Sequence, residues 1–194
     1  MVQKRQTKTE GRIRMALTHL LREKGLEALT VSDVAREAGI NRGTFYAHYV
    51  DKYDLMEKQV QSVIDDLTNL LLAQTGEHAD PHDLVPRANV LAALAYVREN
   101  RRFVAAVTAD GTDARLQKQV KDALAKLIER RASGYPEFTL SYHGIPKDYG
   151  REMLLSSVTS VIWLWLQKDC LESPEEICDI VFANKDLAPA QLLD

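Results

Sequence analysis

The chain has 194 residues, 45% of them apolar and 27% charged, a composition typical of a globular protein and not of collagen or a disordered tail. Its longest stretch without a charged residue, Met153 to Gln167, has fifteen residues and is too short to span a bilayer. There is no apolar signal segment before Met15, and the only cysteines are Cys170 and Cys178. We therefore expect a cytoplasmic protein with ordinary free thiols and no membrane partner.

Charge is distributed unevenly along the chain. Residues 1–52 contain ten Lys and Arg against six Asp and Glu. From totals of 25 basic and 28 acidic residues, the rest of the chain holds 15 and 22. A basic first quarter on an acidic body suggests that the N-terminal end meets a polyanion.

The N-terminal region predicts two helices that end at glycines. Apolar residues at helical spacing over residues 9–24 predict a first helix, which ends at Gly25. Thr30 followed by Asp33 is a variant of the capping box and predicts the start of a short second helix. Gly39 ends it, because glycine takes the left-handed conformation that a sharp turn requires.

Two further helices follow. Asn41 is a suitable cap for a third helix, with Phe45 and Tyr49 one turn apart on its inner side. Asp51 caps a fourth, whose helical spacing continues to Gly76. About 24 residues at 1.5 Å each make it roughly 36 Å long, so it should connect two parts of the protein.

The remainder of the chain also predicts helices only. Residues 76–83 read as a turn and residues 132–147 as a long loop. Ser173 with Pro174 and Glu176 gives the clearest helix start. The other segments with helical spacing lie at 90–97, 103–107, 112–128 and 148–168. Since no alternating apolar pattern or repeat is present, the predicted fold class is all-α, with about nine helices.

Residues 30–52 have the outline of a helix-turn-helix, whose second helix lies in the major groove of DNA. With Phe45 and Tyr49 facing inward, the outer and flanking surfaces carry side chains that can hydrogen-bond: Asn41, Arg42, Thr44, Tyr46 and His48.

Within this set, Arg42 suits a guanine edge and Thr44 a base edge or thymine methyl, while Gly43 allows the backbone to come close. The side chains that suit phosphate oxygens are Tyr46, His48 and Lys52. Double-stranded DNA is therefore the predicted partner.

The run from Ile13 to Leu55 strongly resembles the DNA-binding domain of the TetR family of transcriptional regulators. The elements that carry the resemblance are Thr30-Val31, Ala35, Ala38-Gly39-Ile40, Gly43-Thr44-Phe45-Tyr46, His48-Tyr49 and Lys52 to Leu55. The resemblance implies that Thr30 and Ser32 flank phosphates, that Tyr46, His48 and Lys52 contact the DNA backbone, and that Arg42, Gly43 and Thr44 face bases. It also implies a three-helix DNA-binding domain, residues 1–52, and a C-terminal regulatory and dimerisation domain, residues 53–194.

Residues 161–166 are apolar all around the helix, so this segment must bury two sides. It is either a central core helix or one whose other face, with the ninth helix, meets its twin in a four-helix dimer interface. We favour the second, because a helix-turn-helix protein needs two half-sites. Trp163 and Trp165 point to different sides, so one can serve the interface and the other the core or a pocket rim. The predicted interface residues are Val161, Trp163, Trp165, Ile177, Ile180 and Val181.

No enzyme, metal site or cofactor is predicted. No nucleophile and base fall in a recognisable arrangement. His78 and His82 have the spacing of metal ligands on a helix, but Pro81 between them breaks that helix and favours a solvated turn.

The predicted function is a homodimeric repressor that reads a near-palindromic operator and is released by a small molecule of unknown identity. The alternative is an activator or adaptor controlled by a protein partner docked on the C-terminal domain. VIWLWLQKD followed by SPEEI is similar to the last two helices of a TetR subgroup that includes an activator of dihydroxyacetone kinase operons.

Overall fold

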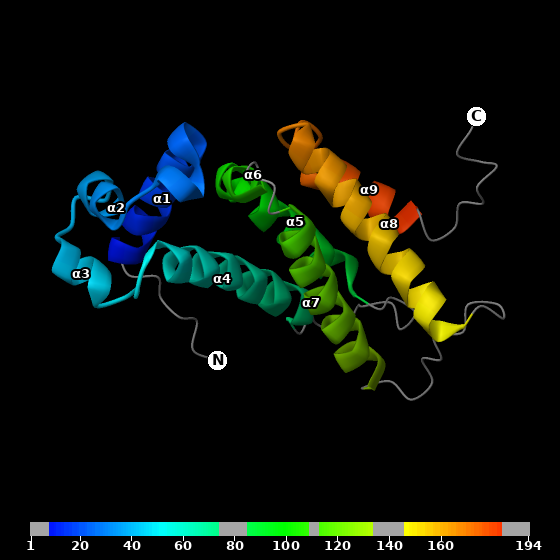
Figure 1. Cartoon of the computed structure of the whole chain (residues 1–194). Coiled ribbons are helices and arrows are strands. Elements are labelled where there is room, and N and C mark those ends of the chain that lie inside the picture. The colour runs from blue at the N-terminus through cyan, green and yellow to red at the C-terminus, as the bar shows by residue number, and fades with distance from the viewer. Residues whose placement is uncertain (1–7, 74–84, 109–112, 134–145, 184–194) are drawn as a thin grey trace. The chain divides into compact units, whose positions relative to one another are not determined.

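The computed structural model describes residues 8–73, 85–108, 113–133 and 146–183, which form nine α-helices (Figure 1). Their bounds are α1 Lys8–Ala28, α2 Val31–Glu37, α3 Arg42–Tyr46, α4 Lys52–Leu72, α5 Arg87–Glu99, α6 Arg101–Thr108, α7 Asp113–Ser133, α8 Lys147–Gln167 and α9 Pro174–Ala183. Because these residues contain no strand, the predicted all-α class is confirmed. None of the described helices combines the length and apolar character needed to cross a membrane.

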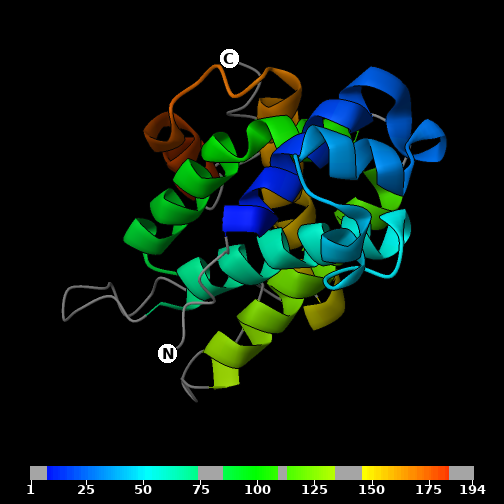
Figure 2. The same ribbon diagram turned by 90° about the vertical axis from the view of Figure 1, so that its left-hand side faces the viewer.

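The chain divides into two compact units. Unit 1 comprises Met1–Val63 and Arg102–Ala114, and unit 2 comprises Ile64–Arg101 and Arg115–Asp194. The first part of α4 and most of α6 therefore belong with the three N-terminal helices, which Figure 2 turns toward the viewer. The boundary expected after residue 52 falls inside unit 1.

Local sequence signals explain the first helix. Gly25 has φ 72° and ψ 170°, so it breaks α1 as predicted, and a short helical stretch then continues to Ala28. The apolar face predicted from the spacing is the buried face of this helix. Its buried residues are Ile13, Ala16, Leu17, Leu20 and Leu21.

The second helix has both predicted end signals. The Thr30 hydroxyl accepts a hydrogen bond from the Asp33 N–H at 3.2 Å, and the Asp33 carboxylate accepts one from the Thr30 N–H at 3.1 Å. At the other end Gly39 has φ 60°, and the Ile40 N–H donates to the Ala35 carbonyl at 2.9 Å. This is the hydrogen-bond pattern of a Schellman turn.

Unit 2 has its own core, in which α5 and α8 both pack on α9. The residues buried together are Leu94, Val97, Trp165, Cys170, Ile177 and Cys178. Burial raises the pKa of the Cys170 and Cys178 thiols, which disfavours their thiolate forms. The Trp165 indole donates to the Glu172 carbonyl at 2.9 Å, so its polar edge is satisfied inside the core.

The start of α9 is as predicted. The Glu176 N–H donates to the Ser173 hydroxyl at 3.2 Å, and the Ser173 N–H donates to the Glu176 carboxylate at 2.7 Å, with Pro174 first in the helix.

Both ends of the expected loop over 132–147 are helical, because α7 extends through Ser133 and α8 begins at Lys147, and residues 134–145 lie outside the described residues. The predicted turn at 76–83, with His78 and His82, lies outside the described residues. Within the described part, no group of three or more His, Cys, Asp and Glu residues could hold a metal ion.

Candidate nucleic-acid interface

Two aromatic side chains hold α3 on the core of unit 1. Phe45 is fully buried and Tyr49 is 5% exposed, with their ring centroids 5.5 Å apart. Asn41 caps the helix, since its Oδ1 accepts from the Thr44 N–H at 2.7 Å. The inward placement of Phe45 and Tyr49 predicted from the sequence is therefore confirmed, and it determines which side chains of α3 face outward.

The outward-facing residues of α3 and of the segment directly after it include those expected to read DNA. Arg42, Gly43, Tyr46 and His48 are exposed and Thr44 is half-buried. The Arg42 guanidinium donates to the Tyr46 hydroxyl at 3.2 Å, and its Cζ lies 5.8 Å from the centroid of the Tyr46 ring. Because these two residues are one turn apart, they present a cation and a phenol on the same face of the helix.

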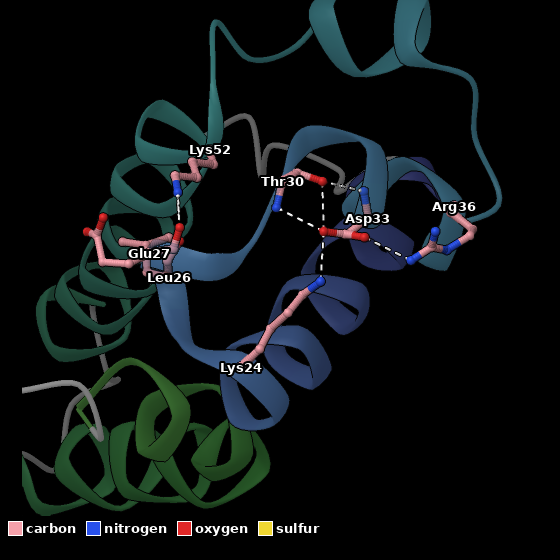
Figure 3. A network of polar contacts seen from close by, with 7 residues as sticks. All are labelled: Lys24, Leu26, Glu27, Thr30, Asp33, Arg36 and Lys52. Atoms are coloured by element: carbon pink, nitrogen blue, oxygen red, sulfur yellow. Dashed lines mark hydrogen bonds and ion pairs between the residues drawn. The ribbon is translucent and has the colours of Figure 1, made fainter.

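Thr30 lies at the start of α2 in a polar network centred on Asp33 (Figure 3). The Asp33 carboxylate accepts hydrogen bonds from the Lys24 ammonium at 2.7 Å, the Thr30 hydroxyl at 2.7 Å and the Arg36 guanidinium at 2.8 Å. The Lys24 hydrogen bond, followed by that of Thr30, holds the pKa of Asp33 well below its usual range. The network ties α2 to α1 and leaves the neighbouring Ser32 exposed.

Lys52 has a structural contact that the sequence analysis missed. Its ammonium donates to the Leu26 carbonyl at 3.0 Å and to the Glu27 carbonyl at 2.7 Å, at the end of α1 (Figure 3). Tyr53 donates from its hydroxyl to the Glu27 carboxylate at 3.2 Å. Lys52 thus joins the start of α4 to carbonyls that end a helix, which need such donors.

A second missed residue is Arg12. Its Nε donates to the Ala38 carbonyl at 2.8 Å, and its Nη2 also donates to the carbonyls of Ala38 and Gly39. A Cβ at Gly39 would lie 2.9 Å from Arg12 Nη2. Arg12 therefore fastens the turn between α2 and α3 to α1. No local sequence signal identifies it, since these partners are 26 and 27 positions away.

The structure corrects part of the predicted dimer interface in unit 2. Trp165 is 1% exposed and Ile177 is 3% exposed, so both belong to the core and leave no surface for a second subunit. Trp163 is half-buried, as are Val161 and Val181, while Ile180 is 47% exposed. The apolar pattern of residues 161–166 predicted that α8 buries two sides. It could not tell the core side from the interface side, because spacing does not reveal which neighbour each side meets.

Several solved structures share this fold. The dihydroxyacetone kinase operon activator DhaS is 16% identical with a TM-score of 0.61, over 91% of this chain and 96% of that one. The fatty acid degradation regulator FadR of Bacillus halodurans is 17% identical with a TM-score of 0.61, over 92% and 94%. A TerR/AcrR-family regulator of Aquifex aeolicus VF5 is 13% identical with a TM-score of 0.61, over 91% and 97%. At these identities the likeness shows the fold alone.

A curated relative is similar in sequence along most of the chain. The uncharacterized HTH-type transcriptional regulator YxbF of Bacillus subtilis is 26% identical over 176 residues, which are 89% of this chain and 43% of that protein. The chain therefore spans less than half the length of this relative.

Family matches cover both the helix-turn-helix and the C-terminal helices. Residues 13–58 match "Bacterial regulatory proteins, tetR family", and these residues include most of α1, all of α2 and α3, and the start of α4. Residues 86–184 match "Transcriptional regulator C-terminal region". With an outward-facing α3 in the first match and the α5, α8 and α9 core in the second, the chain belongs to the TetR family of DNA-binding transcriptional regulators.

Proposed function

We propose that this regulator is a homodimeric repressor that binds a near-palindromic operator and leaves it when a small molecule binds the C-terminal region. The observation that carries the DNA-binding part is the exposed Arg42 and Tyr46 face of α3, on a helix capped by Asn41 and anchored by Phe45. Two such helices in a dimer would meet half-sites about one helical turn, or roughly 10 bp, apart.

For base reading we propose Arg42 on a guanine edge, Thr44 on a base edge or thymine methyl, and Gly43 at the closest backbone approach. The residues proposed to contact or flank phosphates are Thr30, Ser32, Tyr46, His48 and Lys52. Lys52 can combine this role with its contact to α1. Its ammonium has three donors, and two of them bond the carbonyls of Leu26 and Glu27.

For the dimer we propose a four-helix interface of α8 and α9 from each subunit. Exposed apolar side chains support it: Leu164 on α8 is 57% exposed and Ile180 on α9 is 47% exposed. The half-buried Val161, Trp163 and Val181 complete the proposed surface. Apolar exposure of this kind is costly in a lone subunit and is removed by association.

A second candidate is an activator controlled by a protein partner. Its support is the resemblance of the last two helices to a subgroup that includes an operon activator, and the fold shared with DhaS, whose name describes an activator. In either case we propose a cytoplasmic location, because a DNA-binding regulator acts where its DNA lies.

Selection from a random duplex library with the purified protein, beside its Tyr46→Ala variant, tests the proposal. Enrichment of a near-palindromic site by the unaltered protein alone would support a dimer reading DNA through α3. Enrichment by neither protein at low salt would favour the partner-controlled candidate, with DNA binding dependent on that partner. Equal enrichment by both would contradict the role given to Tyr46.

A further inference from the structure

A series of side-chain contacts inside unit 1 begins beside α3, the proposed recognition helix. Tyr49, which packs on Phe45, accepts a hydrogen bond at its hydroxyl from Gln59 Nε2 at 3.0 Å. Gln59, on α4, is 5% exposed, and its Oε1 accepts a hydrogen bond from Arg14 Nε at 2.6 Å. A buried amide with partners on both sides is held firmly, because either unmade bond would be costly.

Arg14, on α1, extends this series of contacts to α6. Its Nη2 donates to the Ser62 hydroxyl at 3.1 Å, and its Cζ lies 5.7 Å from the ring centroid of Phe103. Phe103 is 5% exposed and belongs to the same compact unit. The planar guanidinium can bond in its plane and contact an aromatic face at once, a combination that lysine cannot reproduce.

The chemistry of Arg14 determines how the Gln59 amide is oriented in this series of contacts. A guanidinium has donors and no acceptor, so Gln59 must present its oxygen to Arg14. The amide nitrogen of Gln59 is then the group left to face Tyr49. Displacing Arg14 would therefore disturb the amide, and through it the tyrosine that anchors the end of the recognition helix.

At its other end, this series of contacts reaches α6, which follows α5 of unit 2 directly in the sequence. Only Asn100 separates α5 from α6, and the division between the units falls between Arg101 and Arg102. In α5, Leu94 and Val97 belong to the core of unit 2. Phe103 therefore follows the last residue of α5 by four positions in the sequence.

We propose that Arg14 is a positioning residue for DNA recognition. It joins Phe103 to Tyr49 through Gln59, so that the position of α6 sets the orientation of α3 and hence the affinity for DNA. This inference rests on the proposed use of α3 to read DNA.

A double-mutant cycle on DNA affinity tests the coupling between the two ends of the chain. Tyr49→Phe removes only the hydroxyl, and Phe103→Leu removes the ring that faces Arg14. Val107→Ala is the matched control, because Val107 is also buried on α6 in unit 1. Dissociation constants are measured for the selected duplex with full-length proteins, each checked for an unchanged helical spectrum.

We expect Tyr49→Phe and Phe103→Leu to be non-additive by about 5-fold or more in dissociation constant, the lower end of typical coupling between sites. For Tyr49→Phe and Val107→Ala, the fold-changes in dissociation constant of the single variants should multiply in the double variant. If the fold-changes of Phe103→Leu and Tyr49→Phe also multiply in their double variant, the proposed coupling is wrong.

A second measurement needs no DNA and separates failure of this inference from failure of the proposed function. Backbone amide signals of Arg42, Thr44 and Tyr46 are recorded by NMR in the full chain. Phe103→Leu and Arg14→Lys should both shift them, whereas Val107→Ala should leave them in place. Unmoved α3 signals in Phe103→Leu would overturn the inference even if the protein binds DNA as proposed.

Discussion

The Lys24 ammonium donates to the Asp33 carboxylate at 2.7 Å, which joins the last turn before the break in α1 to the cap of α2. Asp33 also closes the capping box with Thr30. One carboxylate therefore satisfies a helix start and holds two helices together. This makes the packing of α2, on which the placement of α3 depends, sensitive to the charge of a single residue.

The stability of unit 1 should fall in acid partly through Asp33. Because the pKa of Asp33 is lower in the folded protein than in the unfolded chain, its contribution is present above about pH 4 and is lost as pH falls toward the folded pKa. We expect Asp33→Asn to be less stable than the unaltered protein at pH 6, with the gap narrowing toward pH 2. Urea unfolding over this range measures it, and a constant gap would contradict the assignment.

Gly39→Ala should destabilise the protein by about 1–2 kcal/mol, because φ is 60° there and the added Cβ would lie 2.9 Å from Arg12 Nη2. Gly11→Ala is the matched control. A Cβ at Gly11 meets nothing within 4 Å, and alanine favours a helix interior, so this change should stabilise by up to about 1 kcal/mol. Urea midpoints would compare them, and equal shifts would exclude the strain described for Gly39.

Arg42→Ala should relax sequence choice, with a loss of about 1–3 kcal/mol of discrimination at one base position. Tyr46→Ala should instead weaken binding to all duplexes by a similar factor. Both side chains are exposed, so melting temperatures should stay nearly unchanged. Binding to the selected site and its single-base variants distinguishes the two roles, and identical base profiles for both variants would refute them.

Lys52→Ala should have a double effect, unlike Arg42→Ala. Loss of the bonds to the carbonyls of Leu26 and Glu27 should lower the melting temperature, and loss of a phosphate contact should reduce the slope of log affinity against log salt by about 1. Salt titration with a fixed duplex, beside thermal melts, measures both. A lower melting temperature with an unchanged salt slope would assign Lys52 to structure alone.

Ile180→Lys should convert the proposed dimer to folded monomers, since a charge would be buried where two apolar faces meet. Glu175→Lys, on the same helix and also exposed, is the control and should remain dimeric. Sedimentation velocity at several concentrations gives the masses. A dimeric Ile180→Lys protein would move the interface away from this face of α9.

Some site residues could be recognised from sequence, while others required the fold. The outward set on α3 followed from the spacing of Phe45 and Tyr49, which is a local property. Arg12 and the carbonyl contacts of Lys52 were not predictable in this way, because their partners lie 25 to 27 positions away. The same holds for Arg14, whose bond to Gln59 spans 45 positions.

The sequence by itself determined where the helices lie and several of their ends, as the caps at Thr30 and Ser173 and the break at Gly25 show. These features depend on groups within a turn or two of one another. Only the tertiary structure decided that Trp165 and Ile177 lie in the core and that Phe103 joins the N-terminal helices. Helical periodicity states which side chains share a face, but the neighbour that covers a face is chosen by packing between distant segments.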